Sequence, residues 1–302
     1  MKHDKSMIND KVIPSHIQIE IVSGICNLRC IMCLIKQSKR KEIMNNETFN
    51  KILKKLQTDL YNQKFLSLCG LGEPLIDKNV QEKIKIAKEM GFRGIGIYTN
   101  GTLLDEKMSE NLLDAKLDTL IISIDGVTSK TQESIRIGSD LNKIVSNVEH
   151  FIALREREKN KAKTRIIIRF TKQELNKHEE NDFYNFWRSK IKMSYDDSIS
   201  IYNVCDFNSK PDDLLNKIRG LKCPEIYERL VIFSDGSLAL CCFDQFGRYE
   251  IGNILDEDPV KLYNSKYFIH YRELMRKGEI QNLELCKNCP IVYSIATRQI
   301  NK

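Results

Sequence analysis

Short apolar runs alternate with longer amphipathic segments between Ile17 and about Val204. Each run has four to eight residues, is rich in Ile, Val, Phe or Tyr, and has the pattern of a buried strand rather than a strict alternation, as is typical of parallel strands. The predicted strands are Ile17–Val22, Phe65–Cys69, Gly94–Tyr98, Thr119–Ile124, Arg165–Phe170 and Ser198–Val204. The predicted helices between them are Thr48–Leu60, Asn79–Met90, Glu106–Ala115, Leu141–Arg157 and Leu175–Lys192. This alternation predicts an α/β fold with a parallel sheet, either open or closed into a barrel.

The pattern changes after about Asn208, where glycine, proline and cysteine become frequent. Ser234–Ser237 has the composition of a tight turn, and it joins two predicted strands, Arg229–Phe233 and Leu238–Cys242. A last helix is expected over Lys261–Arg276. We therefore place a domain boundary between residues 208 and 222.

The composition is that of a folded chain. Of 302 residues, 41% are hydrophobic and 29% are charged, a balance that excludes wholesale disorder. No apolar stretch approaches the roughly 18 residues that a membrane span needs. The amino terminus lacks the apolar core of a signal peptide, so we expect a cytoplasmic protein without a membrane partner.

The net positive charge is weaker evidence of function than the composition is of folding. Lys and Arg number 48 against 41 Asp and Glu, and the lysines are spread along nearly every predicted helix. This spread is typical of solvated helix faces, although a basic surface for an acidic electron donor or a phosphorylated substrate is the alternative. A nucleic-acid partner is not expected, because arginines and aromatic residues do not interleave on one face.

The cysteines are placed unevenly. The chain has ten, too few for a disulfide scaffold, and a cytosolic location disfavours disulfides. One group lies near the start and another near the end, while Cys69 and Cys205 stand alone. The groups are Cys26, Cys30 and Cys33, then Cys223, Cys241, Cys242, Cys286 and Cys289. Clustered thiols in such a protein indicate metal or redox chemistry.

The first group directly follows the first predicted strand, in the kind of loop that forms the active face of an α/β barrel. Three thiolates can bind three irons of a cubane cluster and leave the fourth iron open to a substrate or cofactor. A structural zinc ion is the alternative reading. It normally takes four ligands, and no nearby His or Cys supplies the fourth.

The motif C-x3-C-x2-C at this position resembles the signature of the radical S-adenosylmethionine (SAM) superfamily. Gly70-Leu-Gly-Glu-Pro74 resembles that family's Gly-Gly-Glu-Pro motif, which contacts the SAM amino group. Thr99-Asn-Gly101 and Ser123-Ile-Asp-Gly126 end the next two strands, where the family's ribose and carboxylate contacts lie. Arg136 matches a recurring arginine. The SAM-binding residues implied by the resemblance are Gly70, Gly72, Glu73, Pro74, Asn100, Ser123, Asp125 and Arg136.

The resemblance implies both a fold and a chemistry. The fold is a partial (β/α)6 TIM barrel. SAM binds the open iron, one electron splits its sulfonium, and the resulting 5′-deoxyadenosyl radical abstracts hydrogen from a C–H bond. The cofactors supply that reaction, while the barrel orients the substrate and excludes water. A flavodoxin or ferredoxin-type protein is the expected electron donor.

The second group of cysteines resembles the SPASM/twitch extension of the same superfamily, in a β-hairpin-plus-helix iron–sulfur domain. Its implied auxiliary [4Fe-4S] ligands are Cys223, Cys286, Cys289 and one of Cys241 and Cys242. Cys241 aligns better, and neighbouring side chains on a strand point to opposite faces. Structural zinc is again the alternative, because C-x2-C also suits a zinc knuckle. The expected domains are 1–16 as an extension, 17–207 as the barrel and 208–302 as the auxiliary domain.

Residues outside the clusters suggest further roles. Cys205 would lie at the mouth of the sixth strand, where a thiol can donate a hydrogen atom to a substrate radical; the spare Cys242 is a second candidate donor. Ordinary packing is the alternative for both. Arg169, Tyr202 and Asn203 occupy strand positions that line a substrate pocket or fill a barrel core.

The leading hypothesis is a radical SAM enzyme that modifies a sugar, an aminocyclitol or another small polar molecule. The single auxiliary cluster resembles that of the 2-deoxy-scyllo-inosamine dehydrogenases, which oxidise a secondary alcohol; epimerisation of a carbon centre is closely related. One alternative is a maturase for a ribosomally made peptide, with recognition supplied by a partner because residues 1–15 are too short for a recognition domain. A second alternative is a non-catalytic iron–sulfur or zinc protein.

Overall fold

The computed structural model describes residues 7–8, 11–57, 65–157, 163–204 and 219–300. The chain divides into two compact units, which are described separately. One unit is Ile19–Val204, and the other combines Met1–Gln18 with Cys205–Lys302. Most of the boundary region expected from the sequence, as well as Cys205 itself, lies outside the described residues.

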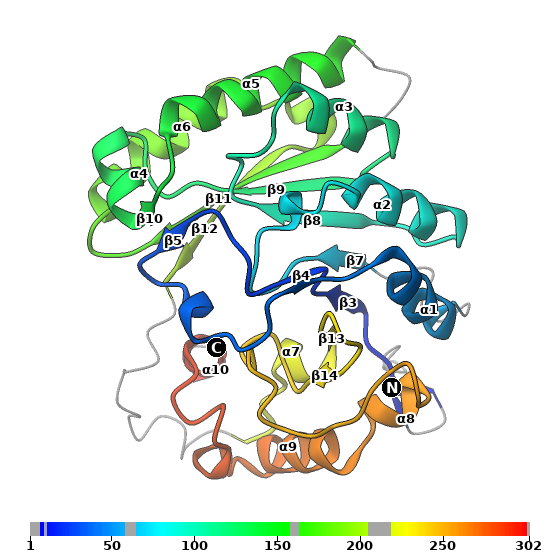
Figure 1. Cartoon of the computed structure of the whole chain (residues 1–302). Coiled ribbons are helices and arrows are strands. Elements are labelled where there is room, and N and C mark those ends of the chain that lie inside the picture. The colour runs from blue at the N-terminus through cyan, green and yellow to red at the C-terminus, as the bar shows by residue number, and fades with distance from the viewer. Residues whose placement is uncertain (1–6, 9–10, 58–64, 158–162, 205–218, 301–302) are drawn as a thin grey trace. The chain divides into compact units, whose positions relative to one another are not determined.

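A parallel sheet forms the centre of the Ile19–Val204 unit (Figure 1). Its strands lie in the order β12-β11-β9-β8-β7. They are β7 (Phe65–Leu68), β8 (Ile95–Thr99), β9 (Thr119–Ser123), β11 (Arg165–Lys172) and β12 (Ser198–Asn203). The end of β3 (His16–Ile19) joins them, because Cys69 N donates a hydrogen bond to Ile19 O. This architecture confirms the predicted α/β fold with a partial barrel.

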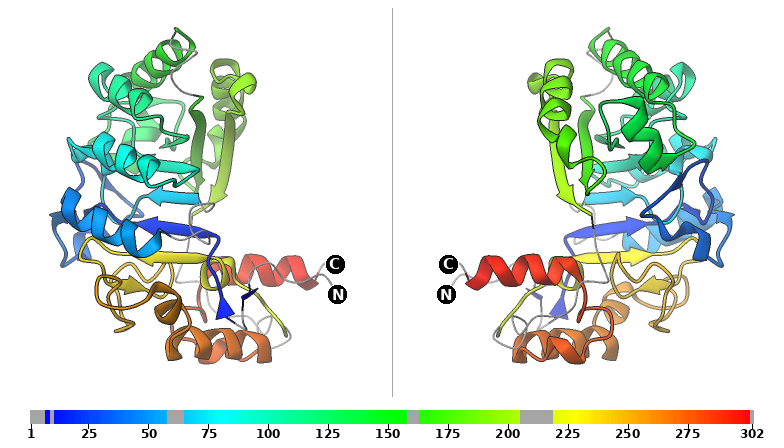
Figure 2. Two further views of the ribbon diagram at one scale, coloured as in Figure 1. Left: turned by 90° about the vertical axis from the view of Figure 1, so that its right-hand side faces the viewer. Right: turned by 90° about the vertical axis from the view of Figure 1, so that its left-hand side faces the viewer.

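Amphipathic helices connect the strands and lie on the outer side of the curved sheet (Figure 2). They are α1 (Asn46–Leu56), α2 (Val80–Glu89), α3 (Glu106–Asp114), α5 (Leu141–Arg157) and α6 (Glu180–Lys190). Asn45 and Asp105 cap α1 and α3 by accepting a hydrogen bond from a backbone N–H of the first turn. A further short helix, α4 (Ser129–Ile135), was not expected from the sequence.

The two faces of the sheet differ in polarity. One face is apolar, and its side chains are fully buried: Leu66, Leu68, Ile95, Ile97, Leu120, Ile122, Ile166, Ile168 and Phe170. A Cβ atom added to Gly101 would lie 3.1 Å from both Ile122 of β9 and Ile144 of α5, so this face packs closely against the helices. The alternate positions, on the inner face, are more polar; they carry Ser67, Gly96, Tyr98, Ser123, Arg169, Ser200 and Tyr202 beside the apolar Ile121 and Ile167.

Two short antiparallel pairs hold the loops at the carboxyl ends of the strands. β4 (Val22–Ser23) pairs with β6 (Glu42–Ile43). β5 (Arg29–Cys30) pairs with β10 (Arg136–Ile137), which sets Cys30 opposite Arg136. Two-residue strands lack the length for a periodic signal, so the sequence did not predict them.

The other unit contains two antiparallel strand pairs and several helices. β1 (Met7–Ile8) pairs with β2 (Lys11–Val12), and β13 (Arg229–Ile232) pairs with β14 (Leu238–Ala239). The helices are α7 (Pro224–Tyr227), α8 (Pro259–Tyr263), α9 (Lys266–Lys277) and α10 (Pro290–Ile300). None of the helices in the described part of the chain is long and apolar enough to cross a membrane.

The prediction of one helix over Lys261–Arg276 was wrong. The helix is interrupted at Asn264, whose side chain exchanges two hydrogen bonds with the backbone of Val12. Ser265 then starts α9 as its N-terminal cap residue with an extended backbone. A tertiary contact far away in the sequence therefore overrides a continuous helical pattern.

Candidate functional site

The Cys26, Cys30 and Cys33 thiols lie together in the loop that follows β4. All three are half-buried. Burial raises the pKa of the Cys26 thiol, and the neighbouring Cys30 and Cys33 thiols raise it further. The structure thus brings together the three residues that the motif singled out. Among the described residues, no three His, Cys, Asp or Glu side chains are arranged to hold a single metal ion.

The glycine-rich segment Gly70–Pro74 is bonded to this loop through the backbone. Gly24 N donates to Leu71 O over 2.7 Å, and Glu73 N donates to Ile25 O over 2.9 Å. A Cβ atom on Gly72 would lie 2.2 Å from Val22 O, a distance that no side chain tolerates. Gly72 is therefore required by the close approach of two backbones.

Gly70 and Pro74 lie at the two ends of this segment. A Cβ atom on Gly70 would lie 2.5 Å from Oε2 of Glu20, so the glycine leaves room for a buried carboxylate. Pro74 starts the short 3-10 helix η2 (Pro74–Ile76), a position where its missing N–H costs nothing.

Glu73 is buried and accepts three hydrogen bonds. The donors are Leu75 N at 3.1 Å, Thr99 Oγ1 at 2.7 Å and Asn100 N at 2.8 Å. Burial raises the pKa of Glu73, and the hydrogen bonds offset only part of that rise. The carboxylate thereby joins the glycine-rich segment to the end of β8.

Asn100 continues the connection from β8 to the cysteine loop. Its Nδ2 donates to Asn27 Oδ1 over 3.0 Å and lies 3.8 Å from Cys26 Sγ. Its Oδ1 accepts from Thr102, whose hydroxyl in turn accepts from Asn27 Nδ2 at 2.7 Å. Sequence reasoning missed Asn27 and Thr102, although Asn27 lies between two motif cysteines.

Arg136 connects the cysteine loop to β9. One guanidinium nitrogen lies 2.8 Å from Asp125 Oδ2, and another lies 3.8 Å from Cys30 Sγ. Burial lowers the pKa of Arg136, but Asp125 and Cys30 raise it by more. Asp125 is fully buried and accepts from Thr171 N at 2.7 Å, which ties the end of β9 to β11. Ser123, the last residue of β9, lies opposite Arg169 of β11.

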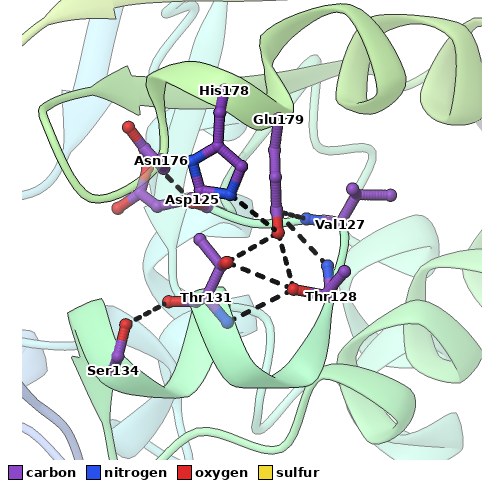
Figure 3. A network of polar contacts seen from close by, with 8 residues as sticks. All are labelled: Asp125, Val127, Thr128, Thr131, Ser134, Asn176, His178 and Glu179. Atoms are coloured by element: carbon purple, nitrogen blue, oxygen red, sulfur yellow. Dashed lines mark hydrogen bonds and ion pairs between the residues drawn. The ribbon is translucent and has the colours of Figure 1, made fainter.

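A polar network contacts Asp125 through its backbone carbonyl (Figure 3). Asn176 Nδ2 donates to the Asp125 carbonyl over 2.9 Å. The buried Glu179 carboxylate accepts from Val127 N at 2.7 Å and from the hydroxyls of Thr128 and Thr131 at 2.6 Å each. These residues fix the start of α4. Sequence reasoning missed them, although Thr128 and Thr131 have the spacing of a helix start.

The second group of thiols gathers in the other unit. Cys223, Cys241, Cys286 and Cys289 are all buried. Burial raises the pKa of Cys223 to about 12, and the nearby Cys289 thiol contributes to that rise. Cys286 lies close to the other three thiols, which also raise its pKa beyond the effect of burial.

Cys242 has a different environment. Its Sγ lies 3.0 Å from Glu225 Oε2, and that carboxylate forms an ion pair with Arg229 over 2.6 Å. The expectation that Cys241 and Cys242 lie on one strand was wrong, because β14 ends at Ala239 and both follow in a turn. Their different surroundings therefore arise from that turn and not from strand alternation.

The donor sets fit iron–sulfur clusters. Thiols are the soft ligands that such clusters need, and the first group is half-buried while the second group is buried. Around the first group, N–H groups of Leu28, Asn100 and Arg136 point at sulfur atoms. Hydrogen bonds of this kind stabilise thiolate ligands.

Two family models match the chain. The radical SAM superfamily model matches residues 21–174, just over half of the chain. The SPASM model, described as an iron-sulfur cluster-binding domain, matches residues 223–290. Together they imply a SAM-binding [4Fe-4S] cluster, an auxiliary iron–sulfur cluster and SAM.

Curated relatives match over part of the chain. A probable GTP 3′,8-cyclase from Methanothermobacter marburgensis is 32% identical over 193 residues, which are 64% of this chain and 58% of the relative. A GTP 3′,8-cyclase from Clostridium botulinum is 31% identical over 138 residues, 44% of this chain and 42% of the relative. The chain thus spans about half the length of the curated relatives it matches.

Solved structures share the fold. BtrN in complex with AdoMet and 2-DOIA has a TM-score of 0.61 at 18% identity, with 93% of this chain and 94% of BtrN covered. AnSMEcpe with bound AdoMet has a TM-score of 0.65 at 20% identity, with 91% and 85% covered. SuiB of Streptococcus suis, bound to precursor peptide SuiA, has a TM-score of 0.61 at 17% identity, with 94% and 71% covered.

The superfamily match, the shared fold and the gathered cysteines agree with one another. The matched region contains the C-x3-C-x2-C loop, the glycine-rich segment and the Asp125–Arg136 pair. The chain therefore belongs to the radical SAM superfamily.

Proposed function

We propose that this protein is a radical SAM enzyme that abstracts hydrogen from a small polar substrate, such as a sugar or an aminocyclitol. The reaction would oxidise a secondary alcohol or epimerise a carbon centre. When bound, the SAM-binding cluster and SAM supply a 5′-deoxyadenosyl radical, and the auxiliary cluster supplies a site that can take up an electron.

The residues of this chain would hold these groups. Cys26, Cys30 and Cys33 would bind the SAM-binding cluster, and Cys223, Cys241, Cys286 and Cys289 would bind the auxiliary cluster. SAM would lie against the carboxyl ends of the strands. Its binding residues would be Gly70, Gly72, Glu73, Pro74, Asn100, Ser123, Asp125 and Arg136.

One observation carries this proposal. The side chains of Glu73 and Asn100 link the glycine-rich segment, the end of β8 and the cysteine loop in one connected set of hydrogen bonds. Such a set holds ligands in place before the cofactor arrives, which reduces the entropy lost on binding. An electron carrier without SAM chemistry has no need for it.

The choice of a small alcohol as substrate is supported by BtrN. BtrN was solved with AdoMet and 2-DOIA, and the likeness covers nearly the whole of both chains. This agrees with the expected resemblance to carbohydrate-modifying dehydrogenases.

A second candidate is the cyclisation of a nucleotide. The curated relatives named GTP 3′,8-cyclase are 31–32% identical to this chain over the matched region. Peptide modification, for which SuiB and its precursor peptide SuiA are the structural parallel, is a third possibility.

The first experiment asks whether the protein cleaves SAM. Protein reconstituted with iron and sulfide without oxygen, then reduced, should release 5′-deoxyadenosine and methionine. It should hold about eight irons, and Cys26/Cys30/Cys33→Ala should hold about four and release neither product. A non-catalytic iron–sulfur or zinc protein would release no 5′-deoxyadenosine in any form.

The second experiment separates the reactions by product mass. Oxidation of an alcohol gives a product lighter by two hydrogens. Epimerisation gives a product of the same mass in ordinary water and incorporates one deuterium in heavy water. Epimerisation should fail in Cys205→Ala or in Cys242→Ala if either thiol donates the hydrogen atom. GTP is tested in parallel. If GTP is converted and the alcohols are not, the proposal of a small alcohol substrate is rejected.

The reductant is part of the proposal. We expect a flavodoxin or ferredoxin-type donor that docks on a basic surface, in line with the net charge of +7. Binding should weaken as salt increases, because salt screens such contacts. Binding that is insensitive to salt would contradict this mode of docking.

A further inference from the structure

Arg169 lies on the inner face of the sheet, near the carboxyl end of β11. The parallel register places it between Ser123 of β9 and Ser200 of β12. Ser123 belongs to the proposed SAM-binding set, so Arg169 lies one strand away from that set. The backbone carbonyl of Arg169 also accepts from Ile124 N over 2.9 Å, which fixes the position of its Cα atom.

The Arg169 side chain is held by an aromatic ring. Its guanidinium carbon lies 4.8 Å from the centre of the Tyr202 ring on β12. Contact with a ring face orients the planar guanidinium group and leaves its edge available for hydrogen bonds. Tyr202 itself is 51% exposed, so the ring and the guanidinium group that it contacts lie on a solvent-accessible side of the strand.

Within the described part of the chain, the Arg169 guanidinium group has no carboxylate as an ion-pair partner. Its Nε is buried without a hydrogen-bond partner there, whereas the residue as a whole is half-buried. Arg155 shows the ordinary arrangement of a buried arginine: its Nε also has no partner, but its two terminal nitrogens form a bidentate ion pair with Asp197 at 2.8 Å. A half-buried cation that lacks a counter-charge and lies beside the proposed SAM-binding residues therefore indicates an anionic ligand.

We propose that Arg169 binds an anionic oxygen group, a carboxylate or a phosphate, on the substrate. This inference rests on the proposed function and narrows its substrate class to anionic molecules. The edge of a guanidinium group matches both oxyanions with two parallel hydrogen bonds. Binding there would place the rest of the substrate beside Ser123, next to the SAM-binding residues.

Arg165 offers a matched control on the same strand. It lies four residues before Arg169 and points to the same face, but it is exposed and donates to Ser198 Oγ over 2.9 Å. Arg165→Gln removes the same charge as Arg169→Gln without touching the proposed site. A general electrostatic effect would therefore appear equally in both variants.

The test measures the binding of simple anions to the reconstituted protein with SAM bound and without reductant. Inorganic phosphate and acetate are titrated separately by calorimetry, which distinguishes a phosphate site from a carboxylate site. At least one of them should bind to the natural chain and to Arg165→Gln with the same affinity. Arg169→Gln should weaken that binding by about tenfold or more, because a charged bidentate contact is lost.

Three further variants guard against misfolding. Arg169→Lys keeps the charge without the planar fork and should retain part of the affinity. Tyr202→Phe should bind like the natural chain, whereas Tyr202→Ala should bind about threefold more weakly because the ring that orients Arg169 is gone. Unchanged anion binding in Arg169→Gln, or no binding of either anion to the natural chain, would overturn the proposal.

Binding of SAM itself is the remaining comparison. If Arg169→Gln loses affinity for SAM as strongly as for the anion, Arg169 holds the SAM carboxylate and the inference is wrong. Because anion binding is measured without reductant, it is independent of SAM cleavage. Failure of SAM cleavage in the natural chain rejects the proposed function. Anion binding that is unchanged in Arg169→Gln rejects only this inference.

Discussion

The guanidinium group of Arg136 lies 2.8 Å from the carboxylate of Asp125, and both side chains are nearly or fully buried. The same guanidinium group points a second nitrogen at Cys30 Sγ. A buried carboxylate thus fixes the position of a cation beside a proposed cluster ligand. Such a contact stabilises negative charge on the sulfur atom and tunes a cluster through its surroundings.

Arg136→Gln should lower the reduction potential of the SAM-binding cluster. Loss of one charge-assisted contact of about 1 kcal/mol corresponds to a shift on the order of tens of millivolts. Redox titration followed by electron paramagnetic resonance measures it. Lys130→Gln removes an equal charge from an exposed site on α4 and should leave the potential unchanged. Equal potentials in Arg136→Gln and the natural chain would show that the contact does not tune the cluster.

Gly72→Ala should disrupt the cysteine loop. The added Cβ atom would lie 2.2 Å from Val22 O and 3.0 Å from Ile25 O, so a backbone segment must move. We expect a loss of stability of about 1–3 kcal/mol, as for other overpacking changes, with weaker binding of iron by the first group of cysteines. Denaturant unfolding and iron analysis check both effects. Gly220→Ala separates the clash from backbone strain, because its added Cβ atom meets nothing within 4 Å although its φ of +68° strains any side chain.

Cys241→Ala and Cys242→Ala should differ in iron content. Cys241 lies among buried thiols, whereas the Cys242 thiol contacts the Glu225 carboxylate. After reconstitution, Cys241→Ala should therefore lose about four irons, and Cys242→Ala should keep all of them. The reverse result would assign Cys242 as the ligand.

Glu179→Gln should destabilise the Ile19–Val204 unit. Burial raises the pKa of Glu179, but the hydrogen bonds from Thr128 and Thr131 lower it by more, so the folded protein favours the charged form. Loss of those charged contacts should cost about 2 kcal/mol at neutral pH. Urea unfolding measures the change. Glu174→Gln, on an exposed side chain that pairs with Lys177, should change stability far less.

His16 should make stability dependent on pH. Burial, together with the nearby Arg229, lowers its pKa to about 3, whereas the unfolded chain takes up a proton near pH 6.5. The unfolded state then binds more protons between these values. The free energy of unfolding should therefore fall by up to about 1.4 kcal/mol per pH unit as the pH drops below 6.5.

Unfolding of the unit that contains His16 can be followed between pH 7.5 and 5.5. His16→Gln should flatten the slope, because glutamine does not titrate. His270→Gln, which changes an exposed histidine of the same unit, should keep it. A slope that His16→Gln leaves intact would assign the pH dependence to other groups.

The sequence by itself determined the strand–helix alternation and the two groups of cysteines. These are local patterns: strands such as Phe65–Leu68 and Thr119–Ser123 are short runs rich in apolar residues, and the motif cysteines lie within eight residues of one another. Local periodicity and spacing can be recognised in the sequence because they do not depend on contacts between residues that are far apart along the chain.

Tertiary structure alone decided which polar groups meet. Arg136 reaches Cys30 across 106 positions, Asn100 reaches Asn27 across 73, and Glu179 reaches Thr131 across 48. The break in the final helix at Asn264 depends on Val12, 252 positions away. Each of these contacts forms because a buried polar group must find a partner, and the fold, not the neighbouring residues, determines which partner is within reach.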